Sequence, residues 1–338
     1  ALREEGVKGV EFKIDQKVGD MMGNSLKSIR DYLRITYEPK GMVPDGYQVS
    51  IVFQDRDQRV DGPSAGTAMA LMLDSLFTGE KLDEGFACTG GITPNGKVTS
   101  IGGVAAKIRG ATRRDCTIVG VPEGNAKGVN DILVLDGVQQ LLDIQVFTMK
   151  DMDEARALSR EEKDKDVQST LDDFKSVADV IAEQGEAALK NARVKERLEA
   201  VLEAMPNHIS AKLLLDHIRG DAPERLSVGG SFHEIDSRSS AVFSRVQRTK
   251  MRGKVSEADE AESAAADARE ELEELDGKIH EKFEDYLKAA IDICKAVEED
   301  ASNGGKDLVE SLKSRWSKIN SIRKKLRDDP EVFEELRG

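Results

Sequence analysis

The first part of the chain mixes two hydrophobic periods. Residues 7–15 and 47–53 alternate apolar and polar positions, which predicts two strands. Between them, residues 18–36 carry apolar side chains three and four positions apart, which predicts a helix. Residues 64–77 are small and apolar, which predicts a buried helix with Ser64 at its start.

The pattern after this helix continues to alternate between strand and helix. Residues 85–100 predict a hairpin around a turn at Pro94-Asn95-Gly96. The following apolar segments predict a helix at 101–113, a strand at 117–121, a short helix at about 136–142 and a strand at 144–148. These elements predict an α+β fold that ends near Ser159.

A charged run at residues 160–172 separates this part from a helical second half. We interpret the run as a solvated linker or helix surface rather than as a binding tail. The apolar spacing beyond it predicts helices at 168–185, 187–204, 207–218, about 256–300 and 305–327. Gly229-Gly230 and Asn303-Gly304-Gly305 are expected to separate them.

Two stretches of the helical half suggest known kinds of helix packing. Residues 195–226 resemble one helix pair of the tetratricopeptide type. That architecture needs about three repeats and only one copy is visible, so an ordinary helical hairpin is preferred. Residues 256–300 predict one long helix that packs against 305–327 as a coiled-coil-like arm. We therefore expect three regions, at residues 1–158, 159–228 and 229–338.

Composition argues against several classes of function, namely nucleic-acid binding, membrane insertion and metal binding. The chain has 338 residues and a net charge of −14, which argues against a nucleic-acid partner because phosphate binding needs a basic surface. No apolar run is long enough to span a bilayer, so membrane insertion is not expected. The histidines lack ligand spacing, and the three cysteines form neither a CxxC pair nor a disulfide framework. We expect no metal and no cofactor.

Ser64 and Lys107 are the candidate catalytic pair. A serine hydroxyl is a poor nucleophile and needs a base. Histidine is the usual base, but all the histidines lie in the helical half, at His208, His217, His233 and His280. A lysine can replace it if its pKa falls several units below about 10.4, and burial in an apolar pocket has that effect. Lys107 follows the apolar run that begins at Ile101, which suits this role.

The neighbours of Ser64 also suit a nucleophile. If Ser64 opens a helix, the free N–H groups of the first turn are expected to hold a developing oxyanion. The small residues Gly62 and Ala65, with Pro63 between Gly62 and Ser64, leave room for a peptide backbone. Asp61 is expected to shape this loop.

Five blocks of the chain resemble the proteolytic domain of Lon-type proteases in order and spacing, over residues 10–158. The blocks are Gly19–Ser25, Asp61–Gly66, Cys88–Thr93, Gly96–Lys107 and Val121–Asn125. The resemblance implies that Ser64 attacks, that Lys107 is the base, and that Thr89 orients the lysine amine by a hydrogen bond. The chain departs from the family at Gly91, where glutamate is common, and at Val60, where lysine is usual.

The resemblance raises the question of an ATPase, because Lon enzymes normally carry one ahead of the protease. We expect none in this chain. The segment Gly91–Val98 resembles a phosphate-binding loop, but Val98 stands where Ser or Thr must bind Mg²⁺. We interpret that segment as a β-turn.

The sequence therefore predicts an ATP-independent Lon-like serine endopeptidase that cleaves unfolded or flexible proteins. Lon-type domains form rings, so a homo-oligomer is implied. The alternative is a non-catalytic scaffold that binds a partner through the same fold and the helical arm. The chain begins at Ala1, so we expect an N-terminal truncation; the cytoplasm is preferred, and an exported form is left open.

Overall fold

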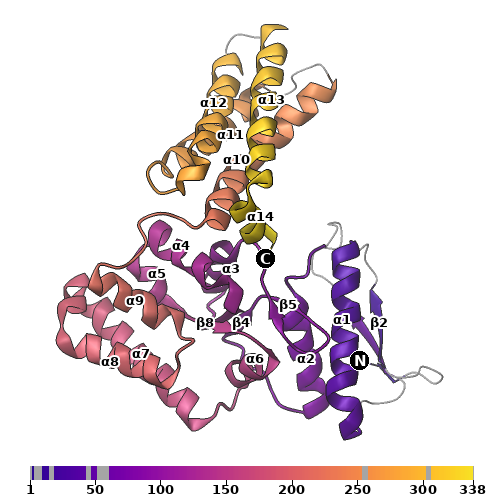
Figure 1. Cartoon of the computed structure of the whole chain (residues 1–338), viewed down its shortest axis with the longest axis vertical. Coiled ribbons are helices and arrows are strands. Elements are labelled where there is room, and N and C mark those ends of the chain that lie inside the picture. The colour runs from indigo at the N-terminus through magenta and orange to yellow at the C-terminus, as the bar shows by residue number, and fades with distance from the viewer. Residues whose placement is uncertain are drawn as a thin grey trace. The chain divides into compact units, whose positions relative to one another are not determined.

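A computed structural model describes residues 2–3, 10–14, 19–42, 47–51, 61–252, 258–301 and 306–337. The chain divides into two compact units, Ala1–Ala222 and Pro223–Gly338. The first unit mixes strands and helices, and the second is helical (Figure 1). The predicted α+β class, followed by helices, is thus confirmed.

The described strands of the first unit form three small sheets. The first has the order β1-β3-β2 and contains β1 (Leu2–Arg3), β2 (Val10–Ile14) and β3 (Tyr47–Ile51). The second is parallel, has the order β4-β7-β8 and contains β4 (Phe86–Cys88), β7 (Ile118–Pro122) and β8 (Gln145–Met149). The third pairs β5 (Gly91–Ile92) with β6 (Val98–Thr99) in antiparallel fashion.

Helices surround these sheets. The first unit contains α1 (Asp20–Tyr37), α2 (Gly66–Thr78), α3 (Val104–Thr112), α4 (Ala126–Asp136), α5 (Val138–Asp143), α6 (Met152–Ser159), α7 (Lys165–Gln184), α8 (Ala192–Ala204) and α9 (Ile209–Arg219). Short 3-10 helices lie at η1 (Glu38–Lys40), η2 (Glu123–Asn125) and η3 (Glu186–Lys190).

The parallel sheet is covered on both faces, as parallel sheets generally are. Successive side chains of a strand point to opposite faces. Val119 and Val121 of β7 therefore pack with α3, α4 and α5, whereas Ile118 packs with Met149 and the helices α1, α2 and α6. In Figure 1, strands β4 and β8 lie between α3 and α6. Ser64, beside α2, and Lys107, on α3, thus come from elements on opposite faces of one sheet.

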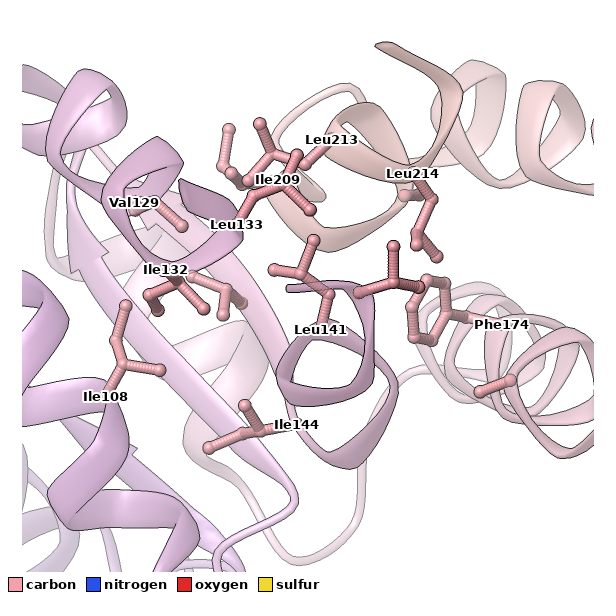
Figure 2. Close-up of a cluster of buried hydrophobic side chains, with 14 of the residues drawn as sticks. Ile108, Val129, Ile132, Leu133, Leu141, Ile144, Phe174, Ile209, Leu213 and Leu214 are labelled. Carbon is pink, nitrogen blue, oxygen red and sulfur yellow. The ribbon is translucent and has the colours of Figure 1, made fainter. Parts of the chain in front are cut away.

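The helices α7 to α9 share a core with the α+β part. Figure 2 shows Leu141 of α5 between Ile132 of α4 on one side and Phe174 of α7 and Leu214 of α9 on the other; Ile108 of α3 belongs to the same cluster. All five side chains are almost fully buried. The compact unit therefore extends beyond the expected boundary at residue 158. The division into two compact units does not test the three expected regions, at residues 1–158, 159–228 and 229–338, so these regions stay a prediction.

Residues just before and within α9 also bind the edge of the sheet. The N–H of Thr148 donates to the carbonyl of Asn207 at 3.0 Å, and the Asn207 amide donates to the Thr148 carbonyl at 2.9 Å. The Ser210 hydroxyl accepts a hydrogen bond from the N–H of Val146 at 2.9 Å. These bonds satisfy the outer edge of β8 at these positions, which would otherwise present unpaired backbone groups.

His208 lies at the centre of this junction. Its ring is fully buried between Phe147 and Phe174, with ring centroids 4.3 and 4.4 Å away. The N–H of Ala211 donates to His208 Nδ1 at 3.2 Å, so Nδ1 carries no proton and caps α9. Burial lowers the pKa of His208 to about 3. The histidine is therefore neutral and structural.

The second unit is a group of packed helices. It contains α10 (Val228–Arg252), α11 (Ala258–Glu273), η4 (Glu281–Phe283), α12 (Glu284–Ala301), α13 (Lys306–Asp328) and α14 (Pro330–Arg337). Helix α12 packs against α11 and α13. Phe243 of α10 meets Trp316 of α13 edge to face, with centroids 5.3 Å apart. The coiled-coil geometry of this arm is not tested and stays a prediction.

Several elements of the first unit differ from the sequence prediction. Helix α2 begins at Gly66, so Ser64 lies in the turn before it. Strand β4 is not part of the hairpin, because it pairs with β7 in another sheet. Helix α4 was missed, since Gly128 and Asn130 interrupt its apolar pattern. The predicted residues 7–9, 15, 52 and 53 lie outside the described part of the chain.

The helical half also differs. The stretch predicted as one helix at 256–300 is two helices, because Gly277 adopts a left-handed φ of 73° in a turn that its Asp276-Gly277 dipeptide indicates. The expectation that Gly229-Gly230 separates two helices is wrong, because both glycines lie in α10, where the N–H of Gly230 donates to the hydroxyl of Ser227 at 2.9 Å. Asn303-Gly304-Gly305 lies outside the described residues.

Candidate active site

Ser64 lies half-buried in a turn whose backbone is fixed to the sheet. Its carbonyl accepts hydrogen bonds from the N–H of Gly90 at 2.9 Å and from the hydroxyl of Thr89 at 3.2 Å. The N–H of Thr67 in turn donates to the Gly90 carbonyl at 3.0 Å. Ser64 and Thr89, predicted to belong to one site, are therefore in direct contact.

Gly90 is required by this arrangement. Its φ is 152°, a region that residues with a side chain rarely adopt. A Cβ atom there would lie 2.7 Å from Cγ1 of Val98 and 3.0 Å from Oγ1 of Thr67. The close approach of the strand connection to the Ser64 turn thus depends on glycine at this position.

Asp61 ties the other end of the turn to α1. Its Oδ1 accepts from the N–H of Met22 at 3.1 Å and from the N–H of Gly62 at 2.9 Å. Gly19, the N-cap of α1, offers no side chain, and a Cβ on it would collide with the Asp61 carboxylate. A carboxylate at a helix N-terminus is favourable. Asp61 therefore acts as the missing cap, a contact that the sequence analysis did not assign.

The backbone donors of the first turn of α2 differ from expectation. The N–H of Gly66 donates to the Pro63 carbonyl at 2.9 Å, and the N–H of Thr67 donates to Gly90. These two groups are already paired, so the expectation that the first-turn N–H groups are free is wrong for both. An oxyanion donor at Ser64 or Ala65 stays a prediction.

Lys107 lies half-buried on α3. Burial lowers the pKa of its amine from the ordinary value. The Nζ atom donates to the carbonyl of Gly102 at 2.6 Å. Among the residues that the structure describes, this bond goes to Gly102 and not to the Ser64 hydroxyl. The desolvated lysine is therefore present, and its pairing with Ser64 stays a prediction.

Gly91 has a steric reason to lack a side chain. A Cβ at this position would lie 2.3 Å from Oγ1 of Thr99 and 3.4 Å from Cβ of Pro63. A glutamate, common here in the Lon family, would displace Thr99. The departure noted in the sequence therefore lets β5 lie close to the Ser64 turn.

The segment resembling a phosphate-binding loop is a hairpin turn. Thr93 donates its N–H to the Lys97 carbonyl at 3.0 Å, and the N–H of Gly96 donates to the Thr93 carbonyl at 2.9 Å. It connects the paired strands β5 and β6, whereas a phosphate-binding loop connects a strand to a helix. The predicted β-turn is confirmed.

The described residues contain no group of three or more His, Cys, Asp or Glu side chains placed to hold a metal ion. None of their helices is both long and apolar enough to cross a membrane.

The first part of the chain is similar to known proteins. Residues 4–159 match the family model of the Lon protease (S16) C-terminal proteolytic domain. The chain is 37% identical over 119 residues to Lon protease 1 of Bacillus subtilis (strain 168), which covers 34% of this chain and 15% of the relative. It is 31% identical over 152 residues to Lon protease 2 of Desulfotalea psychrophila, which covers 44% of this chain and 19% of the relative.

The chain thus spans less than a fifth of the length of these relatives. The match ends where α6 ends, and the helices beyond it lie outside the matched residues. Residues 4–159 of the chain are accordingly similar to the proteolytic domain of the Lon protease family.

Proposed function

We propose that this chain is a serine endopeptidase in which Ser64 attacks the peptide bond, Lys107 is the general base and acid, and Thr89 helps to orient the lysine. The observation that carries the proposal is the hydrogen bond from Thr89 to the backbone of Ser64, combined with a desolvated lysine on α3. A serine, a partly buried lysine and a bridging hydroxyl are the groups that Ser–Lys catalysis needs.

The bond from Lys107 to Gly102 is compatible with this role. A neutral amine has two N–H donors and one lone pair. The Gly102 carbonyl takes one N–H. The second N–H can be donated to the hydroxyl oxygen of Thr89. That oxygen can still accept a hydrogen bond, because the Thr89 hydroxyl uses only its proton when it donates to the Ser64 carbonyl. The lone pair is then left to accept the proton of the Ser64 hydroxyl.

The reaction follows from these roles. The Ser64 oxygen bonds to the carbonyl carbon of the substrate while its proton moves to the Lys107 amine. The tetrahedral intermediate collapses, the carbon–nitrogen bond breaks, and the lysine ammonium protonates the leaving amine. Water then attacks the acyl-enzyme and gives a proton to Lys107. The ester bond to Ser64 breaks, the lysine ammonium returns that proton to the Ser64 oxygen, and the acid is released. Asp61, Gly62, Pro63 and Ala65 shape the turn that holds the nucleophile.

We further propose that cleavage by this chain requires no nucleotide. The segment that resembles a phosphate loop is a hairpin, which removes the one nucleotide-binding candidate that the sequence offered. If cleavage needs no nucleotide, the substrates would be unfolded or flexible proteins. The helices beyond residue 159 would recruit substrates or mediate assembly into a ring.

Cleavage of casein without ATP tests the proposal. The wild-type chain should degrade casein, Ser64→Ala should not, and Ser75→Ala, a serine on the distal part of α2, should retain wild-type activity. If neither the wild-type chain nor the variants cleave casein or any unfolded peptide, with or without ATP, at concentrations that allow oligomers, the proposal fails. The non-catalytic scaffold then becomes the better description.

A further inference from the structure

The side chain of Ser25 on α1 is buried, with 5% of the residue exposed. Its hydroxyl has no hydrogen-bond partner among the described residues. A buried hydroxyl without a partner is destabilising, because on folding it loses its hydrogen bonds to water and gains none within the protein. Native structures contain few buried polar groups without a hydrogen bond, and such a group often has a functional reason.

The Ser25 hydroxyl faces the turn that carries the nucleophile. A Cβ atom on Gly66 would lie 2.9 Å from Ser25 Oγ and 3.2 Å from the backbone nitrogen of Ile92. Gly66 is the first residue of α2, two positions after Ser64. The Ser25 hydroxyl therefore lies close to Gly66, at the end of the turn.

One face of α1 supports the turn on both sides of Ser64. Met22 and Ser25 are three residues apart on α1 and are both buried, so they share a face. The N–H of Met22 binds Asp61 at the start of the turn, and Ser25 meets Gly66 at its end. Ser64 lies between these two contacts. A movement of the turn backbone would therefore change the surroundings of the Ser25 hydroxyl directly.

We propose that Ser25 is a positioning residue for the nucleophile, and that its hydroxyl binds the backbone of the Asp61–Gly66 turn when substrate is attacked. The proposal rests on the proposed peptidase function. A hydrogen bond that is absent at rest and formed in the reacting state lowers the activation barrier, because it favours the transition state alone. The stability that the resting protein loses by leaving this hydroxyl without a partner is then explained by the hydrogen bond that it forms during catalysis.

The test compares Ser25→Ala with Ser28→Ala, a half-buried serine one turn along α1, on a fluorogenic unfolded peptide. We expect kcat of Ser25→Ala to fall about tenfold, the factor for one ordinary hydrogen bond, with KM changed less than twofold. Its Tm should be unchanged or higher, because alanine removes an unpaired group and favours the helix. Ser28→Ala should match the wild type in kcat and KM.

Two results would overturn the proposal: an unchanged kcat for Ser25→Ala, or a loss of kcat matched by a lower Tm and by the same loss in Ser28→Ala. Wild type and Ser64→Ala are measured alongside. If wild type cleaves, Ser64→Ala does not and Ser25→Ala equals wild type, only the Ser25 proposal fails. If wild type cleaves nothing, the peptidase function fails and the Ser25 proposal falls with it.

Discussion

The hydroxyl of Thr89 donates a hydrogen bond to the backbone carbonyl of Ser64, at 3.2 Å. The family resemblance implied a contact from this threonine to the lysine amine. The observed bond adds a second role, because Thr89 is buried and fixes the backbone of the nucleophile itself. One hydroxyl would thus connect both members of the proposed dyad.

Replacing Thr89 by valine removes this connection with little change in shape. The Ser64 carbonyl loses one donor, so we expect Thr89→Val to lower kcat about tenfold and to lose about 1 kcal/mol of stability. Thr89→Ser keeps the hydroxyl and should retain most of the activity. Peptidase kinetics and urea unfolding of both variants measure this, and equal kcat values for valine and serine would show that the bond is not used.

The pH dependence of the cleavage rate should follow the ionisation of Lys107. Burial lowers the pKa of Lys107, and only the neutral amine can accept the serine proton. We expect kcat/KM to rise as pH increases through this lowered pKa and to level off below about pH 10.4, the ordinary lysine value. A rate that is flat from pH 6 to pH 9 while Lys107→Met remains active would exclude lysine as the base.

The same shift affects stability. Between the lowered pKa and about 10.4, the unfolded chain binds a proton at this lysine that the folded chain does not, so folding stability rises with pH there. Removing the half-buried amine avoids its partial desolvation. Lys107→Met should therefore be at least as stable as the wild type at neutral pH while it loses all peptidase activity.

His208 should make the first unit sensitive to acid. Its pKa is about 3 in the folded protein, whereas an unfolded histidine titrates near 6.5. As pH falls from 7 to 5, the unfolded chain gains a proton that the folded chain cannot accept. This should remove about 2 kcal/mol of stability.

A matched variant isolates the contribution of His208. His208→Asn keeps an N-cap acceptor for Ala211 but has no group that titrates in this range. Urea unfolding of both proteins at pH 7 and pH 5, followed by circular dichroism, gives the difference. Identical losses of stability in the two proteins would contradict a neutral, buried histidine.

A buried ion pair connects α2 to α6. The guanidinium of Arg156 donates from Nε to Asp74 Oδ2 at 2.7 Å, and the Asp74 side chain is 3% exposed. Tyr32 and Tyr37 of α1 also donate to this carboxylate. Asp74→Ala leaves the arginine without its partner, so we expect a loss of about 3–5 kcal/mol.

The control for this prediction replaces both charges. Asp74→Leu combined with Arg156→Met leaves no unpaired charge but takes the acceptor from the Tyr32 and Tyr37 hydroxyls, so it should recover part of the lost stability. Thermal unfolding of the single and double variants checks the prediction. A double variant less stable than Asp74→Ala would show that the pair itself, rather than avoidance of an unpaired charge, stabilises the unit.

Local pattern was sufficient for much of the fold. The apolar spacing of residues 18–36 predicts α1, which runs from Asp20 to Tyr37, because one stripe of that helix faces the core. The apolar run at 117–121 predicts β7, because a buried parallel strand is apolar on both faces. Helix α10 was missed because its paired glycines usually separate elements, although Ser227 supplies a cap that offsets them.

The details of the candidate site could not be derived in this way. The bonds from Met22 to Asp61 and from Thr89 to Ser64 join residues that are far apart in sequence, so local periodicity carries no information about them. The same holds for the Ser25 hydroxyl, which has no hydrogen-bond partner among the described residues and lies close to Gly66, a residue far from it in sequence. Family resemblance indicated which residues to inspect, and the contacts supplied their geometry.

The central claim, that Ser64 is the nucleophile, is tested most directly with a peptide boronic acid, because boron becomes tetrahedral when an activated serine oxygen bonds to it. Boron-11 NMR of the complex distinguishes trigonal from tetrahedral boron. We expect a tetrahedral signal with the wild-type chain, and only the trigonal signal of free inhibitor with Ser64→Ala. A tetrahedral signal of equal intensity in both proteins, or none in a wild-type sample that cleaves casein, would contradict Ser64 as the nucleophile.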